Sequence, residues 1–484
     1  MIWLRNAALT TTAFGGSWGG AIWFWRETNR MPDTGDLVLY MLVLPVVLLT
    51  AWWLGRKAWT RVRLSAASAA SAGTAAAAPA AVDAQPPLPP GLSIAASAVR
   101  APHGGTVAEL RAALAGGRAR PALDAELCDD DGYPLMTARL ADAGADTAKQ
   151  EFNWWFNQQS LADPRFEAGQ WRALAAGAAV ASELAAQLSL HRHLQPWLTQ
   201  REERRHNRLP PDAVAVSEPP MLQVLALWPA EWRAEQRDAA QRWLRHVVVE
   251  SGWPLERMAP AAAPSLDPHS AGDAGRQLAG LLQQAGEARH AGVAIVLAAG
   301  SQLGEAEIKQ LAARGALFTA ANAQGEVPGE GAAGLLLADA AQAQLIAGAG
   351  VNTLQAVASG SRAASADQVR RDSDTSLADL AGQVLRDGRT DAAQVALVAA
   401  DTGHRTSRVM ELMRLVTAAA PQLDPGADVI GVGTGCGSCG AVTWMTALVL
   451  ADAEARDRAA PVLCISNEDP YRRCAALITP AAAA

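Results

Sequence analysis

The sequence predicts a layered α/β protein that carries a membrane-spanning helical hairpin and a flexible linker at its N-terminal end. Apolar, strand-like segments such as residues 221–228 alternate with helical patterns such as residues 230–251. Alternation of this kind is typical of helices packed on the faces of a sheet. Two long apolar stretches open the chain, and a segment of small residues and prolines separates them from the rest.

The two apolar stretches predict membrane spans at residues 6–25 and 36–55. Residues 6–25 contain no charge, and the second stretch is uncharged after Asp36. Each has about the 20 residues that a helix needs to cross a hydrocarbon core roughly 30 Å thick. A cleaved signal peptide is the alternative for residues 6–25, but the bulky end of that segment lacks a small-residue cleavage pattern. We therefore expect residues 1–63 to form a hairpin anchor.

Charges around the spans predict the orientation of the chain. Arg56, Lys57, Arg61 and Arg63 follow the second span, whereas the loop between the spans mixes both signs. The positive-inside rule then places the bulk of the chain in the cytoplasm. Residues 64–91 consist almost entirely of alanine, serine, proline and glycine, so they predict a flexible tether.

The folded part is expected to begin near residue 92 and to have two regions, 92–207 and 208–484. The first has a strand pattern at residues 133–140 and helical patterns at 146–157 and 169–190. Aromatic residues crowd the segment 151–159, and they indicate core anchors or, as the alternative, a partner-binding patch. The charged segment 200–208 is interpreted as a solvated connection between the two regions.

Composition narrows the classes of function. Hydrophobic residues make up 50% of the chain and charged residues 18%, which suits a globular protein with a membrane-embedded part. The formal net charge is −7 and the folded part has no basic stripe, so nucleic acid is not expected as the main partner.

A glycine-rich segment at residues 327–339, VPGEGAAGLLLAD, is the most informative motif of the second region. It resembles the glycine-rich segment in the middle of β-ketoacyl synthases and other thiolase-like enzymes. Residues 272–304 resemble the helix that follows the nucleophile in these enzymes and the next strand, and residues 433–451 resemble their closing glycine turn and helix. The resemblance implies a thiolase-like layered α/β fold for residues 208–484.

Three departures from the family put its condensing chemistry in doubt. The neighbourhood that aligns with the nucleophile, residues 269–272, contains no cysteine, and only an ionised sulfur attacks a thioester at a useful rate. Asp401 stands at the place of one active-site histidine, although His404 lies three residues later and is the alternative counterpart. Thr434 stands at the other, and a threonine cannot shuttle a proton near neutral pH as imidazole can.

The segment GCGSCG, residues 435–440, allows two rival chemistries. It fits the G-x-G-x-x-G pattern of a dinucleotide-binding turn, but only about forty residues follow it. Cys436 and Cys439 have the spacing of a redox pair or of half a zinc site, yet a second ligand pair is missing. Small buried residues in a tight turn explain both patterns, so no cofactor and no metal is expected.

Two functions remain open. The first is a non-enzymatic, membrane-anchored adaptor or chaperone-like protein that binds a protein partner. The chain is also similar, in its arrangement alone, to a proteobacterial family that includes the tandem lipase adaptors of type VI secretion. That likeness implies a bacterial inner-membrane location and a secreted lipase effector or secretion spike as the partner. The second is an acyl-thioester-binding or acyl-transfer enzyme with a rebuilt site. Thiolase-like folds are commonly dimeric, so the resemblance also implies a homodimer.

Overall fold

The computed structural model describes residues 91–129, 132–159, 163–206, 214–260, 274–287, 292–368 and 374–481. The expected spans at 6–25 and 36–55, the linker up to residue 90, and the nucleophile neighbourhood at 269–272 lie outside this part. Among the described helices, none combines the length and the apolar character that crossing a membrane requires. The expected regions 92–207 and 208–484 both contribute to a single compact unit.

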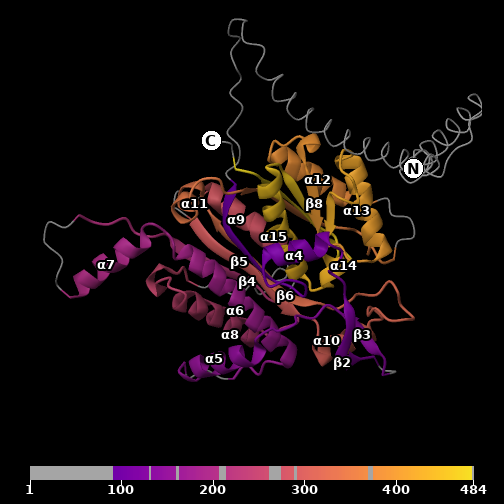
Figure 1. Cartoon of the computed structure of the whole chain (residues 1–484), viewed down its shortest axis with the longest axis horizontal. Helices are drawn as coiled ribbons and strands as arrows, with labels where there is room; N and C mark the ends of the chain where they lie inside the picture. Colours follow the sequence, from indigo (N-terminus) through magenta and orange to yellow (C-terminus); the bar gives the residue numbers. More distant parts are fainter. Residues whose placement is uncertain are drawn as a thin grey trace, which may run out of the picture. The chain divides into compact units, whose positions relative to one another are not determined.

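Nine strands of the described part form one mixed sheet, in the order β4–β5–β6–β1–β7–β11–β10–β8–β9 (Figure 1). The strands β2 and β3 form a separate two-stranded sheet. The strands are β1 (Leu92–Arg100), β2 (Ala122–Cys128), β3 (Pro134–Thr137), β4 (Met221–Leu227), β5 (Gly292–Ser301), β6 (Glu330–Ala338), β7 (Thr353–Ser361), β8 (Leu397–Ala400), β9 (Val429–Gly431), β10 (Val462–Ser466) and β11 (Arg472–Thr479).

The large sheet consists of two halves that repeat one pairing pattern. In the first half β1 pairs antiparallel with β6, β6 antiparallel with β5, and β5 parallel with β4. In the second half β7 pairs antiparallel with β11, β11 antiparallel with β10, β10 parallel with β8, and β8 parallel with β9. A short antiparallel contact between β1 and β7 joins the halves. The first strand of each half therefore lies beside the last strand of the same half.

Helices cover both faces of each half (Figure 1). The helices α5, α6 and α8 pack on the outer face of the first half, and α12 and α13 pack on the outer face of the second. The helices α4, α9 and α15 occupy the inner layer, where α15 contacts strands of both halves. The helices are α4 (Val107–Ala115), α5 (Ala145–Asn157), α6 (Ala168–Leu188), α7 (Leu194–Arg205), α8 (Ala234–Glu250), α9 (Ala274–Glu287), α10 (Glu305–Ala313), α11 (Ala340–Ile346), α12 (Ser376–Asp387), α13 (Thr406–Ala419), α14 (Val432–Cys436) and α15 (Ala441–Arg458), with 3₁₀ turns at Leu255–Arg257 and Ala392–Gln394.

The strands that helices cover on both faces are apolar along their whole length, because neither face meets water. In β5, Ile295 and Leu297 face the outer helices, whereas Val296 and Ala298 face the inner layer. This alternation follows from the two-residue period of a strand. The inner layer is consequently the place where the two halves share one core.

Most sequence-predicted elements are present with shifted ends. The strand expected at 221–228 is β4, and the helices expected at 146–157 and 169–190 are α5 and α6. The helix expected at 230–251 begins later, at Ala234. A turn closed by the hydrogen bond from Trp232 N to Pro229 O (3.2 Å) precedes it, and the Gln236 side chain accepts from Arg233 N at 3.0 Å, which caps the first turn.

The aromatic residues of α5 are mainly core anchors, as the first interpretation predicts. Phe152, Trp155 and Phe156 are buried among the residues of α6 and α8. Trp154 differs, because 67% of its surface is exposed.

The outer edge of β4 is covered by the chain itself. Leu222 O accepts a hydrogen bond from Ala259 N at 2.8 Å, and Val224 O accepts one from Gln241 Nε2 at 2.8 Å. Arg245 Nη1 donates to Ala259 O at 2.7 Å and so holds the covering segment in place.

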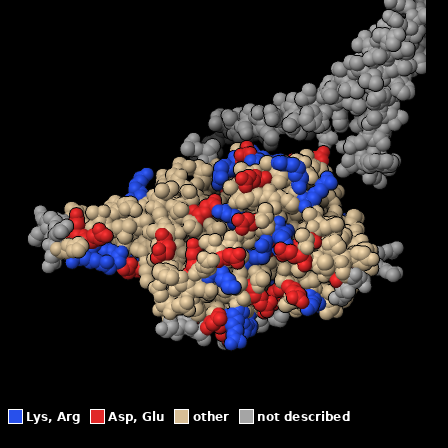
Figure 2. Space-filling view, turned by 60° about the horizontal axis from the view of Figure 1, so that its bottom comes forward, with Lys and Arg blue, Asp and Glu red and all other residues tan. Residues whose placement is uncertain are grey.

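Acidic and basic side chains are interspersed on the face shown in Figure 2. No single-sign patch dominates that view, which agrees with the absence of a basic stripe in the sequence.

Candidate functional site

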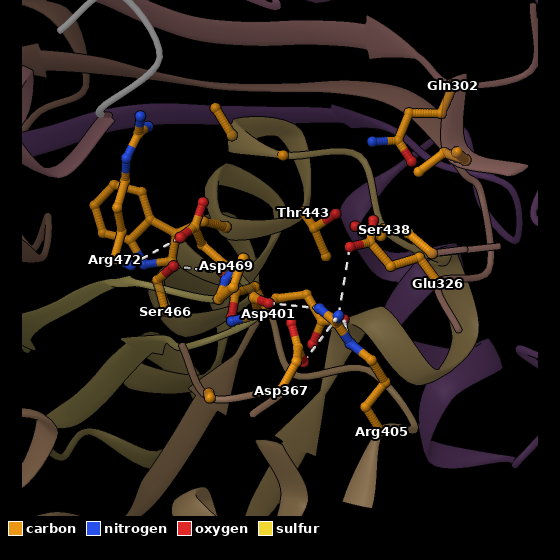
Figure 3. A pocket seen from close by; sticks show the side chains of 18 of the residues that line it. Gln302, Glu326, Asp367, Asp401, Arg405, Ser438, Thr443, Ser466, Asp469 and Arg472 are labelled. Carbon is orange, nitrogen blue, oxygen red and sulfur yellow. Dashed lines mark hydrogen bonds and ion pairs between the residues drawn. The ribbon is translucent and has the colours of Figure 1, made fainter. Parts of the chain in front are cut away.

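A cavity of about 810 Å³ lies where the carboxyl ends of β8 and β10 meet (Figure 3). These two strands are parallel and in register, so Asp401, directly after β8, and Ser466, at the end of β10, come together. Clefts at the carboxyl ends of parallel strands are the usual binding positions in α/β proteins. The start of α9 and the turn between α14 and α15 also contribute to its wall.

Ten charged side chains belong to the wall of this cavity. Six carboxylates face four guanidinium groups, so the wall is acidic on balance when all are ionised. The basic residues are Arg314, Arg405, Arg472 and Arg473, and the acidic residues are Glu231, Glu326, Asp367, Asp401, Glu468 and Asp469.

Asp401 is held rigidly at the base of the cavity. Only 3% of its surface is exposed. Its carboxylate accepts hydrogen bonds from Ser466 Oγ (2.5 Å), Asn467 N (2.8 Å) and Glu468 N (3.2 Å). Burial raises the pKa of Asp401 to about 6, although the hydrogen bonds from Ser466 and Asn467 act in the opposite direction. The group is thus a buried acceptor whose protonation changes in the mildly acidic range.

Arg405, the residue before α13, joins three carboxylates on one side of the cavity. Its Nη2 lies 3.0 Å from Glu468 Oε1, and its Nη1 lies 3.4 Å from Glu326 Oε1 and 3.6 Å from Asp367 Oδ1. Burial acts to lower the pKa of Arg405, but the three carboxylates outweigh it and raise the pKa. Burial raises the pKa of Glu326 in spite of the nearby guanidinium. The network ties together loops from both halves of the sheet.

His404 and Thr434 do not enter the cavity wall. The His404 ring packs edge-on against Phe318, with ring centroids 5.1 Å apart. Its Nε2 is buried and has no hydrogen-bond partner in the described part. Thr434 lies on α14 with its side chain exposed, and its Oγ1 donates to Gly431 O at 2.6 Å. Of the three positions that the sequence singled out, the cavity contains Asp401 alone.

The backbones of these three positions are nevertheless neighbours. A Cβ on Gly433 would lie 2.4 Å from Asp401 O and 2.9 Å from Gly403 N, so the start of α14 packs directly on the loop after β8. Their side chains point to three different surroundings: Asp401 to residues 466–468, His404 to Phe318, and Thr434 to solvent. The arrangement therefore lacks a common point at which the three could act on one substrate.

The glycine-rich segment has a structural role in the first half. Glu330, at the start of β6, is 2% exposed. It accepts hydrogen bonds from Leu140 N (2.8 Å), Arg172 Nε (2.9 Å) and Ser301 Oγ (3.0 Å), and Arg172 Nη2 also donates to it. The carboxylate thus joins α6, the end of β5 and the segment after β3. The motif is recognisable because this junction and the closely packed strand β6 both require it.

The segment 435–440 forms a tight turn and not a dinucleotide-binding loop. Gly435 lies inside the short helix α14, and Gly437 (φ +69°) and Gly440 (φ +53°) form the turn that leads into α15. A dinucleotide-binding motif places its glycines between a strand and a single helix. Two short helical elements in succession do not provide that geometry.

The cysteines of this turn are buried. Burial raises the pKa of Cys436 to about 12 and raises the pKa of Cys439 further. Both thiols are therefore protonated and unreactive near neutral pH. Among the described residues, no three His, Cys, Asp or Glu side chains are placed so that they could hold a metal ion.

Cys474, on β11, is the cysteine that the sequence did not single out and that reaches the cavity. A Cβ on Gly275, in the first turn of α9, would lie 2.6 Å from its Sγ. Arg405, Glu326 and Glu468 are further wall residues that sequence patterns did not indicate. Cys474 is the third residue of β11, and no motif around it in the sequence could have identified it as a cavity residue.

Similarity to known proteins lies in the structure and not in the sequence. No protein family model matches the chain, and no curated protein sequence matches it. Three solved structures of similar fold cover 81% of this chain. One is a ketosynthase in complex with its type II PKS acyl-carrier protein, at 14% identity, 99% coverage of that chain and a TM-score of 0.51.

The other two structures are a β-ketoacyl synthase and a ketosynthase, each from a bacterium. A β-ketoacyl synthase from Burkholderia phymatum STM815 matches at 12% identity, 100% coverage of that chain and a TM-score of 0.50. A ketosynthase from module 1 of the bacillaene synthase of Bacillus amyloliquefaciens FZB42 matches at 12% identity, 73% coverage of that chain and a TM-score of 0.51. The thiolase-like, ketosynthase-type fold that the sequence motifs implied is therefore confirmed. At this level of identity the likeness concerns the fold alone.

Proposed function

We propose that this chain is a non-condensing protein of ketosynthase-type fold that serves as an adaptor for a protein partner. The observation that carries the proposal is the divergence of Asp401, His404 and Thr434. Condensation requires a thiolate and proton-transferring groups aimed at one carbonyl carbon. Here the corresponding backbone positions are close together, but the three side chains face different surroundings.

The character of the cavity supports the same conclusion. An acyl chain gains roughly 0.8 kcal/mol for each methylene moved out of water, provided that the wall is apolar. Ten charged side chains line this cavity, and several of them are held in hydrogen bonds and ion pairs with other wall residues, so those parts of the wall offer an acyl chain no apolar contact. A long acyl chain would therefore gain little by entering it.

A protein partner is a use of this fold that does not require the three side chains to act on one substrate. One solved structure of the same fold is a ketosynthase that binds an acyl-carrier protein, which supports protein binding as a use of this fold. The similarity in arrangement to tandem lipase adaptors makes a lipase effector or a secretion spike component the first partner to test. In this proposal the hairpin at residues 6–25 and 36–55 holds the chain at the bacterial inner membrane, with the bulk in the cytoplasm.

The test uses the tagged full chain in its native host, with cross-linking and identification of co-purified proteins by mass spectrometry. Acyl transfer from a radiolabelled acyl thioester to the purified chain is measured in parallel. We expect one dominant protein partner in the membrane fraction and no acyl transfer. Catalytic turnover of the thioester, or a full chain that recovers no partner above a tag-only control, would overturn the proposal.

Cys474 favours a second candidate, an acyl-transfer enzyme with a relocated nucleophile. Its sulfur reaches the cavity beside the first turn of α9. In this reaction the Cys474 thiol would lose its proton to water, and its sulfur would bond to the thioester carbonyl carbon as the bond from that carbon to the carrier sulfur breaks. The carrier would leave as a thiolate that takes up a proton from water. The candidate requires labelling of the wild-type chain that Cys474→Ala abolishes and Cys128→Ala leaves intact. An unlabelled wild-type chain excludes it.

A further inference from the structure

A groove of about 680 Å³ lies on the outer surface of the first half, among α5, α6 and α8. It is separate from the central cavity, with which it shares no wall residue. Glu151 and Trp154 of α5, Ser182 of α6 and Glu250 of α8 line it, together with the rings of Trp243 and His246 of α8, which make up its floor.

The floor of the groove is aromatic. His246 stacks on Trp155 with ring centroids 5.2 Å apart and an angle of 16° between the planes. Trp243 lies 5.4 Å from the same imidazole and 5.5 Å from Trp155. These three rings rest on the buried aromatic cluster of α5 and α8. Trp154 stands above them with 67% of its surface exposed, so the floor is rigid while one indole remains accessible.

The charge of the groove has one sign. Glu151 and Glu250 are both exposed and line it, whereas no lysine or arginine does. The basic residues near the groove on α5 and α8 have other contacts, and Arg245, next to His246, donates to Ala259 O at 2.7 Å. Lys149 Nζ lies over the Trp171 ring at 5.9 Å, and Arg242 pairs with Asp238 at 2.8 Å.

The imidazole in the floor does not offset this charge. Burial lowers the pKa of His246, against the weaker effect of Glu250, whose carboxylate lies 4.0 Å from Nδ1. The other groups that line the groove from α5 and α6 are Gln150, Ser182 and Ala186, which carry no charge. The groove is therefore acidic at neutral pH.

From this juxtaposition of an exposed indole, an aromatic floor and two exposed carboxylates, we infer that the groove binds a basic segment of the partner protein. In this complex a guanidinium or ammonium group lies against Trp154, beside Glu151 and Glu250. The inference rests on the proposed function because it presupposes a protein partner. Residues 151 and 154 are three apart, and 246 and 250 are four apart, so each pair shares a helix face.

Physical chemistry favours this occupant over an apolar or an acidic one. A cation over an indole face is attracted by the ring quadrupole, and tryptophan is the best of the aromatic acceptors. Exposed tryptophans that pack into a partner are frequent centres of binding energy. The two carboxylates accelerate the encounter with a basic segment and repel an acidic one.

The direct test is a binding titration of the purified full chain with a defined probe. The probe is a fluorescently labelled amphipathic peptide of leucines and arginines, and its matched counterpart has glutamate in place of each arginine. We expect Trp154→Ala and the double variant Glu151→Gln/Glu250→Gln each to weaken binding of the arginine peptide at least tenfold. The double variant Glu202→Gln/Glu203→Gln removes the same charge from exposed positions of α7 and should change binding less than twofold.

Each outcome decides the matter. An equal loss of affinity for the arginine peptide in both double variants would mean that net charge alone causes the effect, and it would overturn the inference. Equal affinity of the wild-type chain for the two peptides, or unchanged binding by Trp154→Ala, would overturn it as well. Circular dichroism of each variant confirms that a loss of affinity does not arise from unfolding.

The partner identified in the native host separates this inference from the proposed function. If the Glu151→Gln/Glu250→Gln chain recovers the partner as well as wild type does, the adaptor function stands but the groove is not the partner's binding site. If neither chain recovers a partner, the proposed function fails. Loss of the partner in that variant alone, together with the peptide result, supports both.

Discussion

The raised pKa of Asp401 predicts an unusual pH dependence of stability. The pKa of this carboxyl rises from an ordinary value of 3.8 to about 6, because burial favours the neutral acid. Between these two values the native state holds a proton that the unfolded state has already released. The free energy of unfolding therefore falls as pH rises through this interval, which is the reverse of the common behaviour of carboxylates.

The size of the effect follows from the shift. At about 1.4 kcal/mol for each pKa unit, the interval amounts to about 3 kcal/mol of stability lost between pH 4 and pH 7. Asp401→Asn cannot titrate, so it lacks this loss. The difference in free energy of unfolding between the variant and wild type should change by about 3 kcal/mol over that range, in favour of the variant at higher pH.

Urea unfolding of the full chain, followed by tryptophan fluorescence at pH 4, 5, 6 and 7, measures this difference. Asp124→Asn is the matched control. Burial acts to raise the pKa of Asp124, but hydrogen bonds from Arg139, Thr137 and the backbone lower it to about 2. Its contribution is complete above pH 4 and is lost only as pH falls toward 2, so the control should differ from wild type by a constant amount. An Asp401→Asn difference that varies by less than about 1 kcal/mol over the range would refute the reasoning.

Three further changes test other parts of the structure. Glu330→Ala should lower the free energy of unfolding by about 3–5 kcal/mol, because it leaves the guanidinium of Arg172 without its buried partner; an unchanged urea midpoint would contradict the role given to the glycine-rich segment. In the native protein a thiol reagent should modify one cysteine rapidly, Cys128, since the other four are buried, and two or more fast thiols in a titration would show that a buried site opens readily. Gly437→Ala should destabilise the protein by about 1–3 kcal/mol more than Gly348→Ala in the same urea assay. Both positions have positive φ, +69° and +81°, but only at Gly437 would the new Cβ meet a backbone oxygen, 2.8 Å away; equal losses would mean that the turn relaxes.

The elements that the sequence predicted best are those with a local signal. The strand β4 was predicted from its apolar run, and α6 from its long helical pattern. The strand β1 carried no comparable pattern. Its place beside β6 and β7 depends on partners more than 200 residues away, as the pairing of Ser93 with Ala338 illustrates. Long-range pairing of this kind leaves no periodic trace in a nine-residue segment.

The same distinction applies to the candidate site. Asp401 could be identified because a family motif places a functional residue near it. Arg405 could not, since its importance arises from Glu468, 63 residues later, and from Glu326, 79 residues earlier. Thr434, the other position that the resemblance indicated, has its hydroxyl turned back to the carbonyl of Gly431, directly before its own short helix. The sequence indicated the positions, and only the folded structure shows where their side chains point.

The covered edge of β4 has a consequence for assembly. An exposed strand edge is a template on which another polypeptide can continue the sheet. On β4 the carbonyl groups of Leu222 and Val224 are already engaged by Ala259 and Gln241, so an incoming strand would first have to displace them. A second copy, if it binds, would therefore not extend the sheet at this edge without displacing them. The same covering protects the molecule from growth into fibrils at this end of its sheet.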